Sequence, residues 1–357
     1  MKRALPSLLS VLASLLICFV AIAIARGNLS VAGNSFLAMT WGAFGDWPRM
    51  FRTGEGIWVL RPLGEAGIKA ALLCFTGLSV AAAFRVGLFN IGAQGQLIVG
   101  AISAAVIGAI PLGPAPVHIT LALLAAAVTG ALWALPAAVL KLWRGVHEVI
   151  STIMLNWIAV SLVESWLVTG PLRATASGVN SISGTAEIAP TAMLPRLLSE
   201  GSRLNLGFLL AVIAALLMAA FLSRTRAGFE WKVVGLSPPA AESSGVAVRN
   251  RVLQAMAVSG GLAGLAGAVL VLGTEFKYPA TLGGQYGFDG IAVALIGGSH
   301  PIGVLVSALF FGGLRAGGTR MQLFGVHKSF PELIQGLALL FVAGKRIWQV
   351  VLERKRR

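Results

Sequence analysis

The chain has 357 residues, of which 57% are hydrophobic and only 11% are charged, and its 28 Lys and Arg outnumber its 13 Asp and Glu to give a net charge of +15. Because soluble domains carry about 25% charged residues, this much apolar surface cannot be hidden in a water-soluble core, and a membrane protein is predicted. The basic residues lie in short breaks between long apolar runs, which excludes the wetted basic face of a nucleic-acid-binding protein.

Ten apolar segments predict an all-α fold, a polytopic transmembrane helix bundle of about ten spans. A span needs about 20 largely apolar residues, and fewer where a helix is broken and buried in protein. The segments are 5–25, 67–84, 91–110, 117–140, 149–168, 206–222, 252–273, 285–298, 301–315 and 331–344. The last three are short and rich in glycine. Glycines three or four residues apart, as at Gly260, Gly264 and Gly267, let helix backbones approach closely, so we expect a compact bundle.

The distribution of charge places both termini in the cytoplasm. The first apolar run follows Lys2 and Arg3 and resembles a secretory signal peptide, but it exceeds the usual length of about 7 to 15 residues, so an uncleaved helix is expected. With the N-terminus inside, the cytoplasmic segments hold 16 of the 28 basic and 4 of the 13 acidic residues, in agreement with the positive-inside rule. This threading makes 1–357 a single transmembrane domain, with an extracytoplasmic loop at 26–66 and a long cytoplasmic loop at 223–251.

Sequence patterns typical of catalytic chemistry are missing. No Gly-x-x-x-x-Gly-Lys-Ser/Thr phosphate loop occurs, so any ATP is expected on a partner subunit. The four histidines never pair at metal-ligand spacing, and no Gly-x-Ser-x-Gly nucleophile elbow is present. We therefore expect no catalytic residue, no metal site and no cofactor bound by this chain.

A polar break at 85–96 interrupts two predicted spans with three glycines and three amides, Asn90, Gln94 and Gln96. Irregular backbone at membrane depth is tolerated where it is buried in protein or lines a watery cavity. The amides can hydrogen-bond a polar neutral solute, or they can satisfy the backbone groups that the glycines leave free. The residue types do not separate these two interpretations.

Glu164 is the one clear ionisable residue inside a predicted span, where a carboxylate costs about 2.5 to 3.5 kcal/mol. It either contacts a substrate or cation, or it lies near the outer end of its span, four residues before Val168, and is paired or reaches water. An ion-coupled carrier needs several such groups deep in the bundle.

The cytoplasmic loop 223–251 has its own organisation. Ser237 can cap a short helix whose first residue is Pro238, and Gly245 can end that helix. One or two turns of small residues suit docking into a groove of a soluble partner, whereas the simpler interpretation is an ordinary capped surface loop.

Four segments resemble signature segments of permease subunits of bacterial ABC importers, in the nucleoside and simple-sugar (ribose-type) subgroup related to branched-chain amino acid permeases. They are Phe89–Gln96, Gly145–Asn156, Ile291–Gly303 and Val234–Gly245. The last resembles the coupling segment that fits onto the ATPase, which assigns that role to Gly235, Pro238, Ala240, Ala241 and Gly245. The candidate solute pathway is Asn90, Gln94, Gln96, Asn156 and Glu164. Many relatives carry an acidic residue where this chain has Gln94, so a charge-based role is not carried over.

The resemblance implies a multi-pass subunit of the bacterial inner membrane that translocates a nucleoside or purine-like solute. Its expected partners are ATP-binding cassette ATPase subunits, a second permease, an extracytoplasmic solute-binding protein and membrane lipid. Amides and two tryptophans, Trp157 and Trp166, suit neutral polar rings better than ions. A simple-sugar (pentose) permease and a stand-alone ion-coupled secondary transporter remain as alternatives, and a channel or structural membrane protein is disfavoured by the organised loop.

Overall fold

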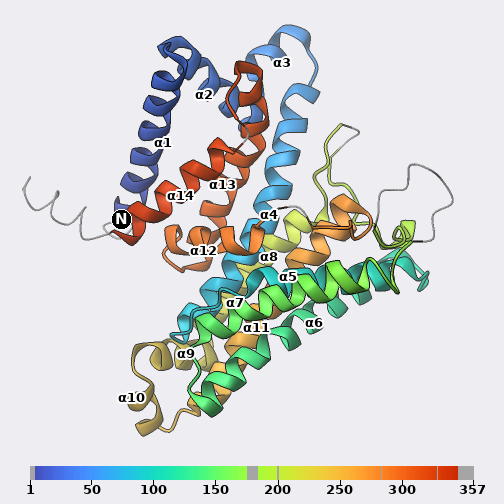
Figure 1. Cartoon of the computed structure of the whole chain (residues 1–357), viewed down its shortest axis with the longest axis vertical. Helices are drawn as coiled ribbons and strands as arrows, with labels where there is room; N and C mark the ends of the chain where they lie inside the picture. The colour runs from blue at the N-terminus through green and yellow to red at the C-terminus, as the bar shows by residue number, and fades with distance from the viewer. Residues whose placement is uncertain (1–4, 175–183, 199–200, 283, 328, 345–357) are drawn as a thin grey trace, which may run out of the picture. The chain divides into compact units, whose positions relative to one another are not determined.

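A computed structural model of the chain describes residues 5–174, 184–198, 201–282, 284–327 and 329–344. These residues are mostly helical and contain no β-strand, which confirms the predicted all-α class (Figure 1). They form two compact units from interleaved segments. The first comprises Met1–Ala70, Arg196–Leu204 and Ala292–Arg357, and the second comprises Ala71–Pro195 and Asn205–Ile291.

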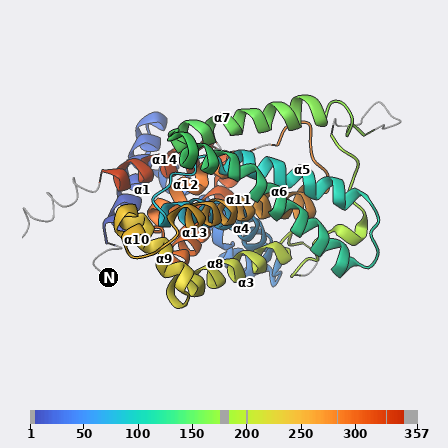
Figure 2. The same ribbon diagram turned by 90° about the horizontal axis from the view of Figure 1, so that it is seen from below.

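The second unit carries all of the predicted functional residues. Its helices are the end of α4 (Ile57–Arg85), α5 (Ala93–Ala109), α6 (Ala115–Arg144), α7 (Glu148–Val160), α8 (Leu206–Arg224), α9 (Arg226–Leu236), α10 (Pro238–Ser243), α11 (Val248–Leu270) and the start of α12 (Tyr286–Ile296). Helices α5, α6 and α11 pack against one another, and α7 and α8 lie at opposite edges of this layer (Figure 2).

Small residues set the distances inside this layer. A Cβ added to Gly130 of α6 would lie 2.9 Å from Gly264 Cα of α11, so the two backbones touch at a point that no larger residue fits. Gly100 of α5 meets the same Gly264. This geometry confirms the close packing expected from the glycine spacing.

Local signals define the helix ends around α6 and α7. Gly145 ends α6 in the left-handed region (φ 67°), which a residue with a side chain adopts at a cost. The short connection is then closed by an ion pair of 2.9 Å between Lys141 Nζ and Glu148 Oε2. The connection between α6 and α7 is therefore short and tied across its two ends.

Two helices of the second unit continue as π-helices. Helix α7 runs on into η1 (Ser161–Leu167), and α11 runs on into η3 (Val271–Glu275), which Phe276 ends at φ 57°. A short 3₁₀ turn, η2 (Pro190–Ala192), lies in the connection to α8 and is held by a 2.8 Å hydrogen bond between Thr191 and the buried His118. Single π-helical turns often occur at functional sites.

The first unit contains the N- and C-terminal helices. They are α1 (Leu5–Arg26), α2 (Leu29–Phe44), α3 (Trp47–Thr53), the start of α4, the end of α12, α13 (Pro301–Met321), η4 (Gln322–Phe324) and α14 (Phe330–Ala343). All ten apolar segments of the sequence form helices. Seven helices among the described residues are long and apolar enough to cross a membrane, and α5, α12 and α14 are shorter apolar helices. The count of ten spans and the cytoplasmic termini stay predictions.

The segment 26–66, expected as an extracytoplasmic loop, is mostly helical. Asn28 caps α2 by accepting a hydrogen bond from the Ser30 N–H (2.9 Å), and α2 then packs along α13. A Cβ added to Gly42 would lie 2.8 Å from Gly317 Cα. At 16 residues α2 is too short to be recognised as a span, and only its contact with α13 shows that one face is buried. On which side of the membrane this segment lies stays a prediction.

Candidate functional site

Asn90 and Gln96 share a buried hydrogen-bond network at the start of α5. Asn90 Nδ2 donates to Gln96 Oε1 (2.9 Å) and to Ser259 Oγ (2.7 Å), and Gln96 Nε2 donates to Asn90 Oδ1 (3.2 Å). Asn90 Oδ1 also accepts from the Gly92 N–H (2.8 Å), and the Ser259 hydroxyl donates to the Ser79 carbonyl (2.6 Å). Both amides are at most 1% exposed. The network agrees with the structural role that the sequence left open, and solute contact by these amides stays a prediction.

Gln94 contacts a different element, the first turn of α12. Its Oε1 accepts a hydrogen bond from the Gly287 N–H (2.8 Å), and its Nε2 donates to the Gly284 carbonyl (3.4 Å). A Cβ added to Gly287 would lie 2.7 Å from Gln94 Cβ, so the close approach requires glycine. Gln94 thereby anchors the segment that leads into α12.

Asn156 ties α7 to the beginning of α5. Its Oδ1 accepts from the Gly95 N–H (2.8 Å), and its Nδ2 donates to the Ile91 carbonyl (2.9 Å). These are backbone groups that the irregular segment before α5 cannot satisfy within a helix. Asn156 therefore lies beside Asn90, Gln94 and Gln96 at the start of α5. The sequence does not reveal this proximity, because about 60 residues separate Asn156 from the three amides.

Glu164 lies apart from the amides, within η1. Its Oε1 accepts hydrogen bonds from the Tyr278 hydroxyl (3.2 Å) and from the Leu282 N–H (2.9 Å). Burial raises the pKa of Tyr278, and the negative charge of Glu164 raises it further, so the phenol stays protonated and donates. The structure thus brings Glu164 to the segment after η3. Contact with a substrate or cation stays a prediction.

The loop 223–251, predicted to be cytoplasmic, has the predicted short helix. Ser237 caps α10 through its Oγ, which accepts from the Ala240 N–H (3.4 Å), and Gly245 follows the helix at φ 78°. Ala241 is fully buried, and a Cβ added to Gly235 would lie 3.0 Å from the Arg85 carbonyl carbon at the end of α4. These two predicted coupling residues therefore contact their own chain.

No group of three His, Cys, Asp or Glu side chains suited to a metal ion lies among the residues that the structure describes. The polar groups gathered around α5 are amides, hydroxyls and backbone groups. In this structure these groups hydrogen-bond one another and nearby backbone groups.

Comparison with known proteins decides the family. The model of the family described as branched-chain amino acid transport system / permease component matches residues 65–343. The chain belongs to this permease family. The permease is 38% identical over 284 residues to the guanosine ABC transporter permease protein NupP of Bacillus subtilis, covering 79% of this chain and 80% of that protein.

Two further relatives are similar over comparable lengths. The permease is 35% identical to the nucleoside ABC transporter permease protein NupB of Lactococcus lactis, over 82% of each chain. It is 33% identical to the glucose ABC transporter permease protein TsgB13 of Haloferax volcanii, over 78% of this chain and 75% of that one. No solved structure matches it. With its helices long enough to span a bilayer, the chain is a multi-pass protein of the bacterial inner membrane.

The loop 223–251 of the permease exposes two large apolar residues that sequence reasoning missed. Leu236 at the end of α9 is 77% exposed, and Phe229, seven residues earlier, is 64% exposed. Pro238 and Ala240 of α10 are also exposed. The i, i+7 spacing of two large apolar residues in a segment expected to face water was the available signal, because it places both on one side of a helix. The exposed surface of the loop therefore includes the apolar residues Phe229, Leu236, Pro238 and Ala240.

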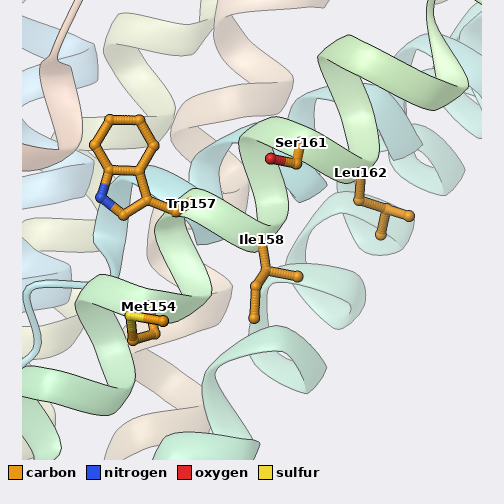
Figure 3. A pocket seen from close by; sticks show the side chains of 5 residues that line it. All are labelled: Met154, Trp157, Ile158, Ser161 and Leu162. Carbon is orange, nitrogen blue, oxygen red and sulfur yellow. The ribbon is translucent and has the colours of Figure 1, made fainter.

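The outer face of α7 holds an open groove of about 440 Å³. Its lining residues are Met154, Trp157, Ile158, Ser161 and Leu162 (Figure 3). Trp157 stands out from the helix with 67% of its surface exposed. The sequence singled out Trp157 for its aromatic ring. Only the structure shows that the ring lies on the exposed face of α7, which points away from α5.

Proposed function

We propose that this permease is the membrane subunit of an ATP-driven importer that carries a nucleoside or another purine-like solute into the cell. The observation that supports this most directly is its similarity, across most of both chains, to permeases named for guanosine and for nucleosides. The buried side chains around α5 are uncharged amides and hydroxyls, which are compatible with a neutral polar cargo.

The importer requires partners that this chain does not supply. Two ATPase subunits bind its cytoplasmic face, a second permease completes the pore, and an extracytoplasmic binding protein delivers the solute. ATP is held by the ATPase subunits, and this chain binds no cofactor and performs no covalent chemistry. The exposed surface of α9 and α10 supports the docking of an ATPase. Large apolar side chains such as those on α9 are unfavourable in water, and a bound partner would cover them.

A simple sugar is the second candidate cargo. The similarity to a glucose permease supports it. A sugar lacks the aromatic base of a nucleoside, so the two cargoes differ in whether an aromatic side chain can stack on them.

Transport in reconstituted vesicles tests the proposal. The permease is co-reconstituted with its second permease, ATPase and binding protein, and the uptake of labelled guanosine, ribose and glucose is measured. ATP-dependent uptake of guanosine in preference to the sugars is expected. Preference for glucose or ribose would replace the nucleoside with a sugar. Uptake by the permease alone, driven by an ion gradient and indifferent to ATP, would establish a secondary transporter instead.

A further inference from the structure

Trp157 is placed unusually for a membrane tryptophan. It is the tenth residue of the 20-residue apolar helix Glu148–Leu167, halfway along it, and 67% of its surface is exposed. Its indole N–H makes no hydrogen bond to any residue that the structure describes. Tryptophan is enriched at the two membrane interfaces, where the ring meets lipid and the N–H meets water, and an unsatisfied N–H facing hydrocarbon is costly.

Two other helices of the second unit, α6 and α8, show what a lipid-facing surface of this protein looks like. From Leu121 to Leu140 every exposed residue of α6 is aliphatic or proline, and the exposed residues of α8 between Leu209 and Leu217 are Leu and Ile. The exposed tryptophan of α6, Trp143, lies in the last turn of that helix, as an interface anchor should.

The exposed face of α7 differs from these surfaces in composition. Besides aliphatic residues and Met154, α7 and its continuation η1 expose two serines, Ser161 and Ser165, and two tryptophans, Trp157 and Trp166. An aromatic ring with nearby hydroxyls is poorly matched to lipid chains and well matched to a planar polar molecule.

The groove beside Trp157 is an open face. All five of its lining residues lie on the continuous helix formed by α7 and η1. Trp157 and Ser161 lie one turn apart on it, and the π-helix η1 begins at Ser161 (Figure 3). The regular α-helix therefore ends where the groove is most polar.

We propose that this groove lines the solute route and that the Trp157 indole stacks on the aromatic ring of the solute, with the Ser161 hydroxyl as a hydrogen-bonding neighbour. The ligand class is a neutral, planar heteroaromatic ring with hydrogen-bonding groups, such as a purine nucleoside. This assignment rests on the proposed function and adds to it the surface that recognises the base. A stacking platform tolerates different bases, since every base presents a π-face.

Uptake by substituted permeases in the complete complex tests the stacking. Trp157→Leu removes the ring and should lower guanosine uptake by about 5- to 150-fold, the usual effect of losing one base-stacking contact. Trp157→Phe keeps an aromatic face and should retain most of the uptake. Trp143→Leu, at the membrane interface, is the matched control and should transport as the wild type does.

Three outcomes would contradict the proposal. Normal guanosine uptake by Trp157→Leu would mean that the ring faces lipid. Loss of the second permease from the purified Trp157→Leu complex would mean that the groove is an interface between the two permeases. A wild-type complex that carries no nucleoside at all would overturn the proposed function itself, and the stacking role with it.

Chemical labelling tests the groove independently of transport rates. The native cysteines, Cys18 and Cys74, are buried. In the assembled complex, Trp157→Cys should react with a water-soluble, membrane-impermeant thiol reagent, and guanosine should slow the reaction. Val128→Cys, on the exposed middle of α6, should stay unreactive because it faces lipid. Equal inertness of both cysteines would show that no watery route passes Trp157.

Discussion

The Tyr278 hydroxyl donates a hydrogen bond of 3.2 Å to Glu164 Oε1, across 114 residues of sequence. The same oxygen accepts from the Leu282 N–H (2.9 Å). One carboxylate in the π-helical end of α7 thus holds the segment that follows η3 at two points. An isolated carboxylate in a span is costly, and these two donors offset part of that cost.

This geometry predicts the behaviour of Glu164 variants. Glu164→Ala leaves the buried Tyr278 hydroxyl and the Leu282 N–H without an acceptor, at a cost of about 1 to 3 kcal/mol for each group. Glu164→Gln keeps an acceptor oxygen and should be clearly more stable than Glu164→Ala in thermal unfolding of the detergent-solubilised complex. If both variants melt as the wild type does while uptake is lost, Glu164 acts on the solute or on a cation instead.

Asn90→Leu is expected to damage the fold before it affects solute contact. It leaves the buried Gln96 amide and the Gly92 N–H without their partner, which costs about 1 to 3 kcal/mol per group, and it removes one of the donors to Ser259. Thermal unfolding and the yield of assembled complex should both fall. Gln94→Glu is the comparison, since it retains the acceptor for Gly287. Normal assembly of Asn90→Leu with abolished uptake would favour the solute-pathway interpretation.

The α9–α10 loop predicts a contrast between adjacent residues. Ala240→Trp alters the exposed surface and should abolish solute-stimulated ATP hydrolysis in a complex that still assembles. Ala241→Trp overfills a buried site within the chain, and overpacking usually costs about 1 to 3 kcal/mol, so lower thermal stability is expected. ATPase assays and melting curves of both variants separate the two effects. Normal ATP hydrolysis by Ala240→Trp would remove this surface from the coupling contact.

Contact between α2 and α13 depends on two glycines. Gly42→Leu should strongly destabilise the permease, because even a Cβ at this position lies 2.8 Å from Gly317 Cα. Gly33→Leu on the same helix is the matched control, since nothing lies within 4 Å of a Cβ there. Thermal unfolding compares them. Equal melting of the two variants would mean that α2 does not pack on α13 in the membrane.

The membrane orientation predicted from charge can be tested at two exposed positions. Ala240→Cys should be labelled only from the cytoplasm, and Ala186→Cys only from outside. Ala186 is chosen because it is exposed. The preceding residue, Thr185, is only 6% exposed, and its hydroxyl accepts a hydrogen bond from the Tyr278 N–H (3.0 Å). Labelling from the opposite side at either position would overturn the ten-span threading.

The sequence by itself determined the class of the fold and the positions of its apolar helices. Long uncharged segments cannot remain in water, and a lone segment in lipid must satisfy its backbone within itself, so apolar length alone predicts a helix. Capping is equally local, which is why Ser237 and Pro238 predicted α10 correctly.

Only the tertiary structure decided what the polar residues touch. Gln96 and Ser259 are 163 positions apart and share Asn90 as a partner, and Gln94 reaches Gly287 rather than either of them. Likewise, Ala240 and Ala241 are identical in type, yet the first is exposed and the second buried. Hydrophobic periodicity fixes that a residue lies on a helix, whereas the partner it meets depends on which helices approach closely. That choice rests on contacts between distant segments, such as Gly130 against Gly264, that no local pattern encodes.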